Sequence, residues 1–332
     1  MASDRPQPPP TLDRALGLLD EGRPEEAEAV LRQVVDSGHP DHAPHAAILL
    51  GAVLMLRDQP EDAVQVWHRV VQTGHREHAP WAALILGQEY AEQCDLGSPK
   101  QAEAEAAYHW VIDSGHPDHA PAAALHLGNL WARWGSVDTA EQAYRRAIDS
   151  GHADHAPEAM IQLALLFEGG RRTPEAEAIY RRAAESGHAD AAPRAERNLG
   201  FVLEAAGRTA DAEAAYGRAV ASGHPAFAPS AAGNLARLHA AAGRTEEAIA
   251  TYRQIVDVDH PHESPLAAIA LGHIYAAAGR PDDADGMYRR AMEFGPYYET
   301  LAAGAVERLH TEEVPLSGQP VKGSGPNRPQ AT

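Results

Sequence analysis

Apolar residues recur along this chain at steps of three and four positions, in segments that are separated by short polar linkers. The segment 121–134 has Ala124, Leu127 and Trp131 on one face of a helix, and the proline at its start suits the first helical turn. Gly135 then ends the segment. The spacing therefore predicts an amphipathic helix over about residues 121–134.

A second amphipathic segment follows directly. Ser136 or Asp138 can cap its start, Tyr144 belongs to an apolar stripe with the same spacing, and Gly151 suits a left-handed C-terminal cap. The last linker of the chain departs from this, with Asp259 in place of the glycine. The two segments predict a helical hairpin, whose members we call helix A and helix B.

The linker Ser-Gly-His that follows helix B marks a repeat of this hairpin. Its histidine recurs every 36 residues, with one longer interval of 41 residues. The positions are His39, His75, His116, His152, His188, His224 and His260. A unit of this length cannot bury its apolar face alone, so stacked neighbours must supply the core. The periodicity predicts an all-α repeat array.

Two pairs of positions hold the same kind of residue from one hairpin to the next. Helix A has a leucine followed by a small residue, at Leu50, Leu86, Leu127, Leu163, Leu199, Leu235 and Leu271. Helix B has an alanine at Ala27, Ala63, Ala104, Ala140, Ala176, Ala212, Ala248 and Ala284. Four residues after each alanine comes Leu31, Trp67, Tyr108, Tyr144, Tyr180, Tyr216, Tyr252 or Tyr288. Small residues let two helices approach and large ones fill the gap beside them, so these positions are the predicted core.

The order of these residues resembles a known family. Residues 127–147 contain "LGNLW…A…Y..A", which is similar to the tetratricopeptide repeat, and the ending "RAAESGHAD" of another helix B resembles the Sel-like sister repeats. The unit is two residues longer than the family's usual 34, and the extra length lies in the linker. The resemblance implies a right-handed superhelical solenoid of about eight helix-turn-helix repeats, which binds a peptide or protein segment in its concave groove.

The chain divides into four segments on this basis. Residues 1–10 are rich in proline and are expected to be a disordered leader, and residues 11–296 form the array, with an insertion at 94–100 that lengthens one hairpin loop. Residues 297–310 predict a capping helix, and residues 311–332 a disordered tail.

Composition narrows the classes of function. The 332 residues carry 28 Lys and Arg against 47 Asp and Glu, a formal charge of −19, which argues against nucleic acid or an anionic membrane as a partner. The start does not resemble a secretory signal, and no apolar run approaches the ~18 residues of a membrane span. A single cysteine, Cys94, excludes an internal disulfide and agrees with a reducing compartment. We expect a cytoplasmic protein.

The linker histidines are the strongest candidate for metal chemistry. Four linkers contain H-x-x-H with an acidic residue inside, a donor set that suits zinc or nickel, but the linkers at His188 and His224 lack the second histidine. The favoured interpretation is structural: the first imidazole suits the C-terminal dipole of helix B, and the acidic residue caps the next helix A. A metal-responsive protein stays an alternative, as does a regulatory subunit of a partner enzyme.

No catalytic constellation stands out from the repeat pattern. Cys94 lies in the insertion with no nearby histidine, and no glycine-rich loop could cradle a phosphate. We expect an exposed or half-buried thiol, no cofactor and no enzymatic activity.

Positions of helix A that face the inner groove in the family are free of the packing pattern, and they give the candidate partner-binding residues. They include Ile48, Leu84, Gln88, Leu125, Asn129, Arg133, Ile161, Arg194, Arg197, Phe201, Arg237 and His273. The early part is apolar, whereas the three arginines at 194, 197 and 237 could converge on one carboxylate, so a protein or peptide ligand with acidic and apolar character is expected. Two simpler interpretations stay open: the apolar members extend the core, and the arginines pair with neighbouring glutamates.

Overall fold

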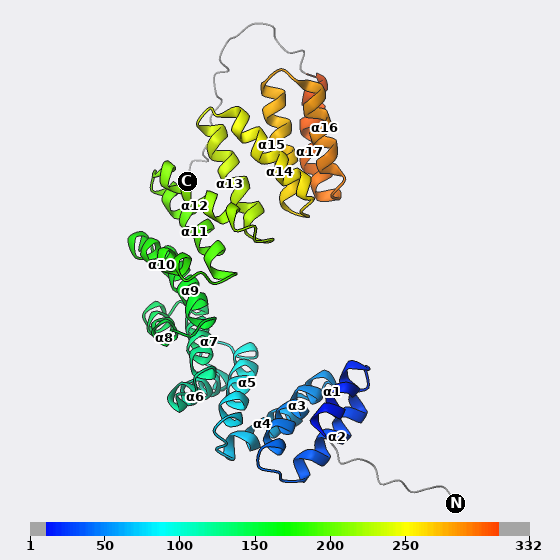
Figure 1. Ribbon diagram of the computed structural model, residues 1–332, viewed down its shortest axis with the longest axis vertical. Helices are drawn as coiled ribbons and strands as arrows, with labels where there is room; N and C mark the ends of the chain where they lie inside the picture. Colours follow the sequence, from blue (N-terminus) through cyan, green and yellow to red (C-terminus); the bar gives the residue numbers. More distant parts are fainter. Residues whose placement is uncertain (1–10, 312–332) are drawn as a thin grey trace, which may run out of the picture. The chain divides into compact units, whose positions relative to one another are not determined.

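A computed structural model describes residues 11–311, which form seventeen α-helices in consecutive hairpins (Figure 1). The A helices are α1 (Leu12–Asp20), α3 (His42–Leu56), α5 (His78–Glu92), α7 (His119–Arg133), α9 (His155–Gly169), α11 (Ala191–Ala205), α13 (Ala228–Ala241) and α15 (Glu263–Ala277). The B helices are α2 (Pro24–Asp36), α4 (Pro60–Gln72), α6 (Pro99–Ser114), α8 (Val137–Asp149), α10 (Thr173–Glu185), α12 (Thr209–Ala221), α14 (Thr245–Val258) and α16 (Pro281–Met292). Helix α17 (Pro296–Thr311) covers the stretch for which the sequence predicts a capping helix.

The chain divides into two compact units, Met1–Ala195 and Glu196–Thr332, with the division inside α11. From α1 to α10 and from α12 to α17, each helix packs on the helices next to it in sequence. Successive A helices also contact one another, in the first unit from α3 to α9 and in the second from α13 to α17, whereas successive B helices do not pack extensively on each other. The A helices therefore form one face of each unit, the inner face, and the B helices form the outer face. The fold is an all-α solenoid, as predicted.

The predicted core positions of helix B are buried in every hairpin. All eight alanines are fully buried, and the large residue four positions later is at most 8 % exposed. Seven of those eight large residues are aromatic, and five of them lie against a glycine of their own helix A. A Cβ atom placed on Gly128 would come within 2.5 Å of the Tyr144 ring, and one on Gly87 within 2.6 Å of Tyr108. The glycine is thus required by the close approach of the ring.

The leucine of helix A follows the same rule with one exception. Six of the seven leucines are buried, for example Leu163 with no exposed surface, whereas Leu235 in α13 is only half-buried and Leu238 is the buried leucine there. In the three hairpins without the glycine, Ala15, Ala164 and Ala236 are fully buried, so the extra methyl group is accommodated inside the core. The pattern read from the sequence therefore describes the core of both units.

Each linker histidine caps the A helix that follows it. The His152 Nδ1 atom accepts hydrogen bonds from the backbone N–H groups of Asp154 and His155, at 3.2 and 3.3 Å. The equivalent two bonds are present at all seven linker histidines. An accepting Nδ1 carries no proton, so the proton of the neutral ring lies on Nε2. The imidazole therefore accepts hydrogen bonds from the free N–H groups at the start of the helix, as an N-cap side chain does.

This arrangement corrects the capping expected from the sequence. The acidic residue inside the linker, Asp154 in this example, makes no side-chain capping bond. The histidine reaches forward to the next helix instead of back to the dipole of helix B, because its Nδ1 lies at the right distance from the second and third N–H groups that follow it. The backward contact is made by the serine before the glycine: Ser150 Oγ donates to the Ala147 carbonyl at 2.6 Å and accepts from the His152 N–H.

The last linker achieves the same bonds with different residues. Val258 replaces the serine and Asp259 replaces the glycine, yet Asp259 adopts the left-handed conformation at φ 60°. The fully buried Ser264 of α15 supplies the missing hydroxyl, which donates to the Ile255 carbonyl at 2.6 Å and accepts from the His260 N–H at 2.7 Å. The bonding pattern is therefore kept where the sequence motif is lost.

The insertion changes one hairpin only. Helix α6 is 16 residues long, against 13 for α8, and Ser98 caps its start by accepting from the Gln101 N–H at 3.3 Å. Cys94 is buried, at 9 % exposed, which corrects the expectation of an exposed or half-buried thiol. Its Sγ atom donates to the Ala91 carbonyl and is covered by the Arg133 guanidinium of α7, each at 3.3 Å. The expected leader, residues 1–10, and the tail beyond Thr311 lie outside the described residues.

Candidate binding site

The candidate groove residues fall into two groups by burial. Ile48, Leu84, Leu125 and Ile161 are buried, at 8 % exposure or less, so they pack between the A helices and leave little surface for a partner. The interpretation that the apolar members extend the core holds for these four. The polar candidates of the first unit lie at the surface of the inner face.

Three of the polar candidates lie in one cleft. Gln88 of α5 and Asn129 and Arg133 of α7 line a cleft of about 420 Å³ between these two A helices, here called the inner cleft. Its other walls include His126 and the B-helix residue Tyr108, whose rings stack with their centroids 6.0 Å apart. The structure thus brings together residues that are about 40 positions apart in the sequence.

Hydrogen bonds fix the side chains of this cleft. The Gln88 amide donates to His126 Nε2 at 2.9 Å, and burial, the main cause, lowers the pKa of His126, which agrees with a neutral, accepting ring. The Tyr144 hydroxyl donates to Asn129 Oδ1 at 2.9 Å, which leaves the amide N–H groups of Asn129 available. Arg133 donates to the Ala91 carbonyl at 2.8 Å. The cleft is therefore held in shape without a ligand.

Two carboxylates of the inner cleft have no counter-charge in contact. Glu89 and Glu92 line the cleft from α5, one helical turn apart, and neither has a hydrogen bond or ion pair with any described residue. Burial, and then the charge of Glu92, raise the pKa of Glu89. Elsewhere in this unit the half-buried Glu141 and Glu158 each face an arginine. The negative charge of the inner cleft is thus left without a partner.

Tyr108 was missed as a functional candidate because the sequence marks it only as core. Its side chain is 1 % exposed and lines the inner cleft, and its hydroxyl has no hydrogen-bond partner in residues 11–311. The equivalent hydroxyls of Tyr144, Tyr180 and Tyr216 donate to Asn129, Glu168 and Glu204 of their own A helices. The signal was available in the sequence: the third hairpin has an alanine, Ala91, where those glutamates stand.

The arginine candidates have acceptors of their own. Arg194, in the first unit, contacts Glu158 at 3.1 Å. In the second unit Arg237 contacts Glu204 at 2.6 Å, and this hydrogen bond is the largest cause that lowers the pKa of Glu204. The interpretation as ion pairs with glutamates holds for these two arginines. Their convergence on one ligand, with Arg197, stays a prediction.

The remaining candidates lie on the inner face of the second unit. The guanidinium of Arg197 lies 5.3 Å from the centre of the Phe227 ring, and the neighbouring Phe201 is 59 % exposed. His273 is exposed, and its Nδ1 atom is 2.8 Å from the Tyr288 hydroxyl. These residues are not gathered into one cleft by the described structure.

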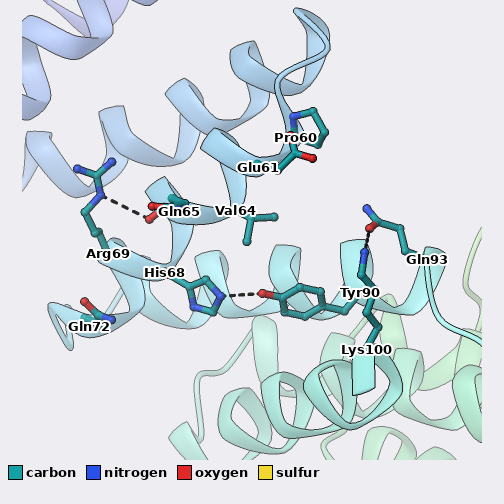
Figure 2. Close-up of a pocket in the computed structure, with 10 residues that line it drawn as sticks. All are labelled: Pro60, Glu61, Val64, Gln65, His68, Arg69, Gln72, Tyr90, Gln93 and Lys100. Carbon is teal, nitrogen blue, oxygen red and sulfur yellow. Dashed lines mark hydrogen bonds between the residues drawn. The ribbon is translucent and has the colours of Figure 1, made fainter. Parts of the chain in front are cut away.

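A second, larger cleft lies on the outer face of the first unit, between α4 and the α5–α6 hairpin (Figure 2). This outer cleft has a volume of about 610 Å³. Figure 2 shows His68 pointing at Tyr90 on its floor, where the His68 Nε2 atom and the Tyr90 hydroxyl are 2.7 Å apart. Lys100, from the first turn of the lengthened α6, hydrogen bonds to Gln93 at one end. The sequence pattern did not indicate this cleft.

The linker histidines form stacked pairs on the first unit. The ring centroids of His116 and His119 are 4.4 Å apart, and those of His152 and His155 are 4.6 Å apart. Within residues 11–311 no three or more His, Cys, Asp or Glu side chains are grouped so that they could hold a metal ion. In the second unit Phe227 takes the place of the second histidine and stacks on His224 at 4.7 Å. The stacked pair is thus a packing motif, in which a phenylalanine ring can replace the second histidine.

These features define a class of protein: a stack of helical hairpins with a constant core and variable surfaces, which is an α-solenoid. Models of the tetratricopeptide repeat match residues 12–72, 100–155, 137–196, 161–225, 197–264 and 267–294, well over half of the chain. The chain belongs to the tetratricopeptide-repeat family. A comparison with curated proteins gave no match in sequence.

Two solved structures, both with TM-scores above 0.5, agree on the fold, and a third is similar over part of the chain. A Sel1 repeat protein from Oxalobacter formigenes is 18 % identical, with 90 % of each chain covered and a TM-score of 0.54. The protective antigen c5321 of uropathogenic Escherichia coli, described as having an SLR fold, is 18 % identical over 90 % of this chain and 64 % of its own, with a TM-score of 0.55. YrrB, described as a TPR protein with an unusual peptide-binding site, is 20 % identical over 61 % of this chain and 100 % of its own, with a TM-score of 0.45.

None of the helices in residues 11–311 is both long and apolar enough to cross a lipid bilayer.

Proposed function

We propose that this protein is a non-enzymatic scaffold that binds a peptide or protein segment on the inner face of its repeats. In the first unit the contact is the inner cleft. The observation that carries the proposal is the convergence of Gln88, Asn129 and Arg133 from two adjacent A helices on one cleft. Side-chain amides and a guanidinium can bond the carbonyl and N–H groups of an extended peptide.

The size and the rigidity of the cleft support a specific contact. A volume of about 420 Å³ lies at the lower end of the range of small-ligand sites, roughly 300–1,000 Å³, so it suits one or two residues of a partner. The hydrogen bonds of Gln88 and Arg133 hold these side chains before any partner arrives. A preformed site loses less conformational entropy on binding.

The test uses two matched obstructions and immobilised pools of random nine-residue peptides. Ala91→Trp places an indole in the inner cleft, and Val64→Trp places one in the outer cleft; both positions are half-buried. We expect the wild type and Val64→Trp to retain peptides from the pools and Ala91→Trp to retain at least tenfold less, with all three proteins melting at similar temperatures. Equal retention by the two variants, or no retention by the wild type, would contradict the proposal.

Two other features of the proposal rest on the sequence alone. A cytoplasmic location stays a prediction, which fractionation of the native cell tests. A partner with acidic character also stays a prediction, and its basis is weakened because Arg194 and Arg237 already face glutamates. Pools of acidic peptides in the same assay test it.

A further inference from the structure

We propose that the inner cleft is a subsite for a basic side chain, a lysine or an arginine of the bound segment, with Glu89, Glu92 and the Tyr108 hydroxyl as its acceptors. This inference rests on the proposed function and specifies its chemistry. Its starting point is the cleft between α5 and α7, in which these three residues line the wall.

The first argument is charge. Glu89 is half-buried and Glu92 lies one turn further along the same helix, so the two negative charges repel each other at the mouth of a partly dehydrated cleft. Arg133 lines the same cleft, but its guanidinium bonds the Ala91 carbonyl and lies 4.9 Å from the Trp134 ring. A cation placed between the two carboxylates relieves the repulsion.

The second argument is the Tyr108 hydroxyl, which is independent of the glutamates. The Tyr108 side chain is 1 % exposed and lines the cleft, and no residue within 11–311 bonds its hydroxyl, so this oxygen is available to a ligand in the cleft. The ring cannot turn away, because it is packed against Gly87. The hydroxyl therefore faces the cleft, where an N–H donor of a lysine or arginine can reach it.

The third argument is the difference from the other hairpins. Gln88 occupies the position of Asn129, yet its amide is bound to His126 and does not serve its own tyrosine. Ala91 occupies the position of Glu168, which accepts from Tyr180. Both possible acceptors of the Tyr108 hydroxyl are thus absent or engaged in this hairpin, while two carboxylates are added beside it. Within residues 11–311 the Tyr252 hydroxyl also has no hydrogen-bond partner, and Ala240 stands at the position of Ala91, but the charged group that acts on Tyr252 is Arg237. The third hairpin differs by its two added carboxylates.

The donor chemistry favours a basic side chain over other ligands. Carboxylates accept charge-assisted hydrogen bonds from guanidinium and ammonium groups, and an arginine can bond both carboxylates and the tyrosine with its five N–H donors. The net charge of −19 for the chain favours the approach of a basic segment at long range. An acidic side chain in the same place would meet both glutamates.

The experiment uses immobilised nine-residue peptide pools that differ only in a fixed central residue, which is Lys, Arg, Leu or Glu, in the presence of a chelator. The variants are Glu89→Gln with Glu92→Gln in the inner cleft and, as a control of equal charge, Glu61→Gln with Glu103→Gln on the B helices. We expect the wild type and the control to retain the Lys and Arg pools about tenfold better than the Leu and Glu pools. The inner-cleft variant should bind all four pools alike.

The outcomes separate the subsite from the proposed function. Retention of all pools by the wild type without preference for Lys or Arg overturns the subsite and leaves peptide binding standing, whereas no retention of any pool overturns both. Equal loss of preference in the control variant also overturns the subsite, because the effect would then come from net charge. Tyr108→Phe adds a test of the hydroxyl: we expect a threefold to tenfold loss for the Lys and Arg pools only, and Tyr144→Phe should show none.

Discussion

The third hairpin, α5 with α6, and the fourth, α7 with α8, have the same core and different surfaces. In both, a glycine of helix A lies against a tyrosine of helix B, and a Cβ atom on either glycine would come within about 2.6 Å of the ring. In the fourth hairpin the tyrosine hydroxyl is bonded to Asn129, whereas in the third it has no partner among residues 11–311. The third hairpin also has the lengthened α6, with a cleft on each side of it.

This difference shows where a repeat array can change. The core positions of neighbouring units contact each other, so a change there disturbs several helices at once. The hairpin loop and the solvent-exposed positions of helix A contact few other residues. They therefore accept an insertion or a new charge while the repeats keep their stacking register. A site can therefore be built on one repeat while the packing pattern stays intact.

The largest expected loss of stability tests whether the cores of the third and fourth hairpins are equivalent. Leu86→Ala and Leu127→Ala remove leucines that are 2 % and 4 % exposed. Each should lower the free energy of unfolding by about 2–5 kcal/mol, as truncations of buried leucine do. Urea unfolding measures this, and a loss below about 1 kcal/mol in one of them would show that the third and fourth hairpins differ in their cores.

The next effect tests the histidine caps. His75 caps α5 and His116 caps α7, and replacement of either by alanine should lower the free energy of unfolding by about 0.5–2 kcal/mol. His116 should lie at the upper end, because it is buried and its Nε2 atom is 3.4 Å from Glu77. The control His116→Asn keeps a capping oxygen and should recover part of the loss. Two neutral alanine variants would contradict the capping role.

A smaller effect separates the two tyrosine hydroxyls. Tyr144→Phe removes the bond to Asn129 and should lower the free energy of unfolding by about 0.5–1.5 kcal/mol. Tyr108→Phe removes a hydroxyl that has no partner among the described residues, so the change should stay within about 0.5 kcal/mol. Thermal melting of both variants in peptide-free buffer is the measurement. Equal losses would mean that the Tyr108 hydroxyl is paired in solution.

The smallest expected effect is on the pH dependence of stability. Burial, and then the neighbouring His116, lower the pKa of His119 below its ordinary value of 6.5. Above pH 6.5 the ring is neutral in the folded and the unfolded chain; below it the unfolded chain binds the proton first, so stability falls as the pH falls. The groups that face His119 are His116, Asp118, Glu77, His155 and the Trp81 ring.

The variant His119→Phe isolates this contribution, because Phe227 already stacks on His224 at the equivalent position. We expect melting curves between pH 7.5 and pH 5.5 to show a smaller loss of stability for this variant than for the wild type. A loss of the same size in both proteins would assign the pH dependence to other groups, such as His78 and His155, whose pKa values burial also lowers.

The candidate site could be predicted only in part from the sequence. The resemblance to the tetratricopeptide repeat placed Gln88, Asn129 and Arg133 on the inner face, and the structure gathers them in one cleft. The same resemblance placed Ile48 and Leu84 there, but they are buried, because the A helices approach closely enough to cover them. Periodicity gives the angle of a side chain around its helix and does not give the distance to the next helix.

The sequence by itself determined the hairpin unit, its period and the identity of its core, because small and large residues recur at fixed positions and a single hairpin cannot bury them alone. Tertiary structure alone decided which polar groups find partners. The His152 ring caps the helix after it, the Ser264 hydroxyl replaces a lost linker serine, and the Tyr108 hydroxyl finds no partner in the part of the chain that the structure describes. Hydrogen bonds depend on distances of a few tenths of an ångström between helices, and these follow from the packing of whole side chains.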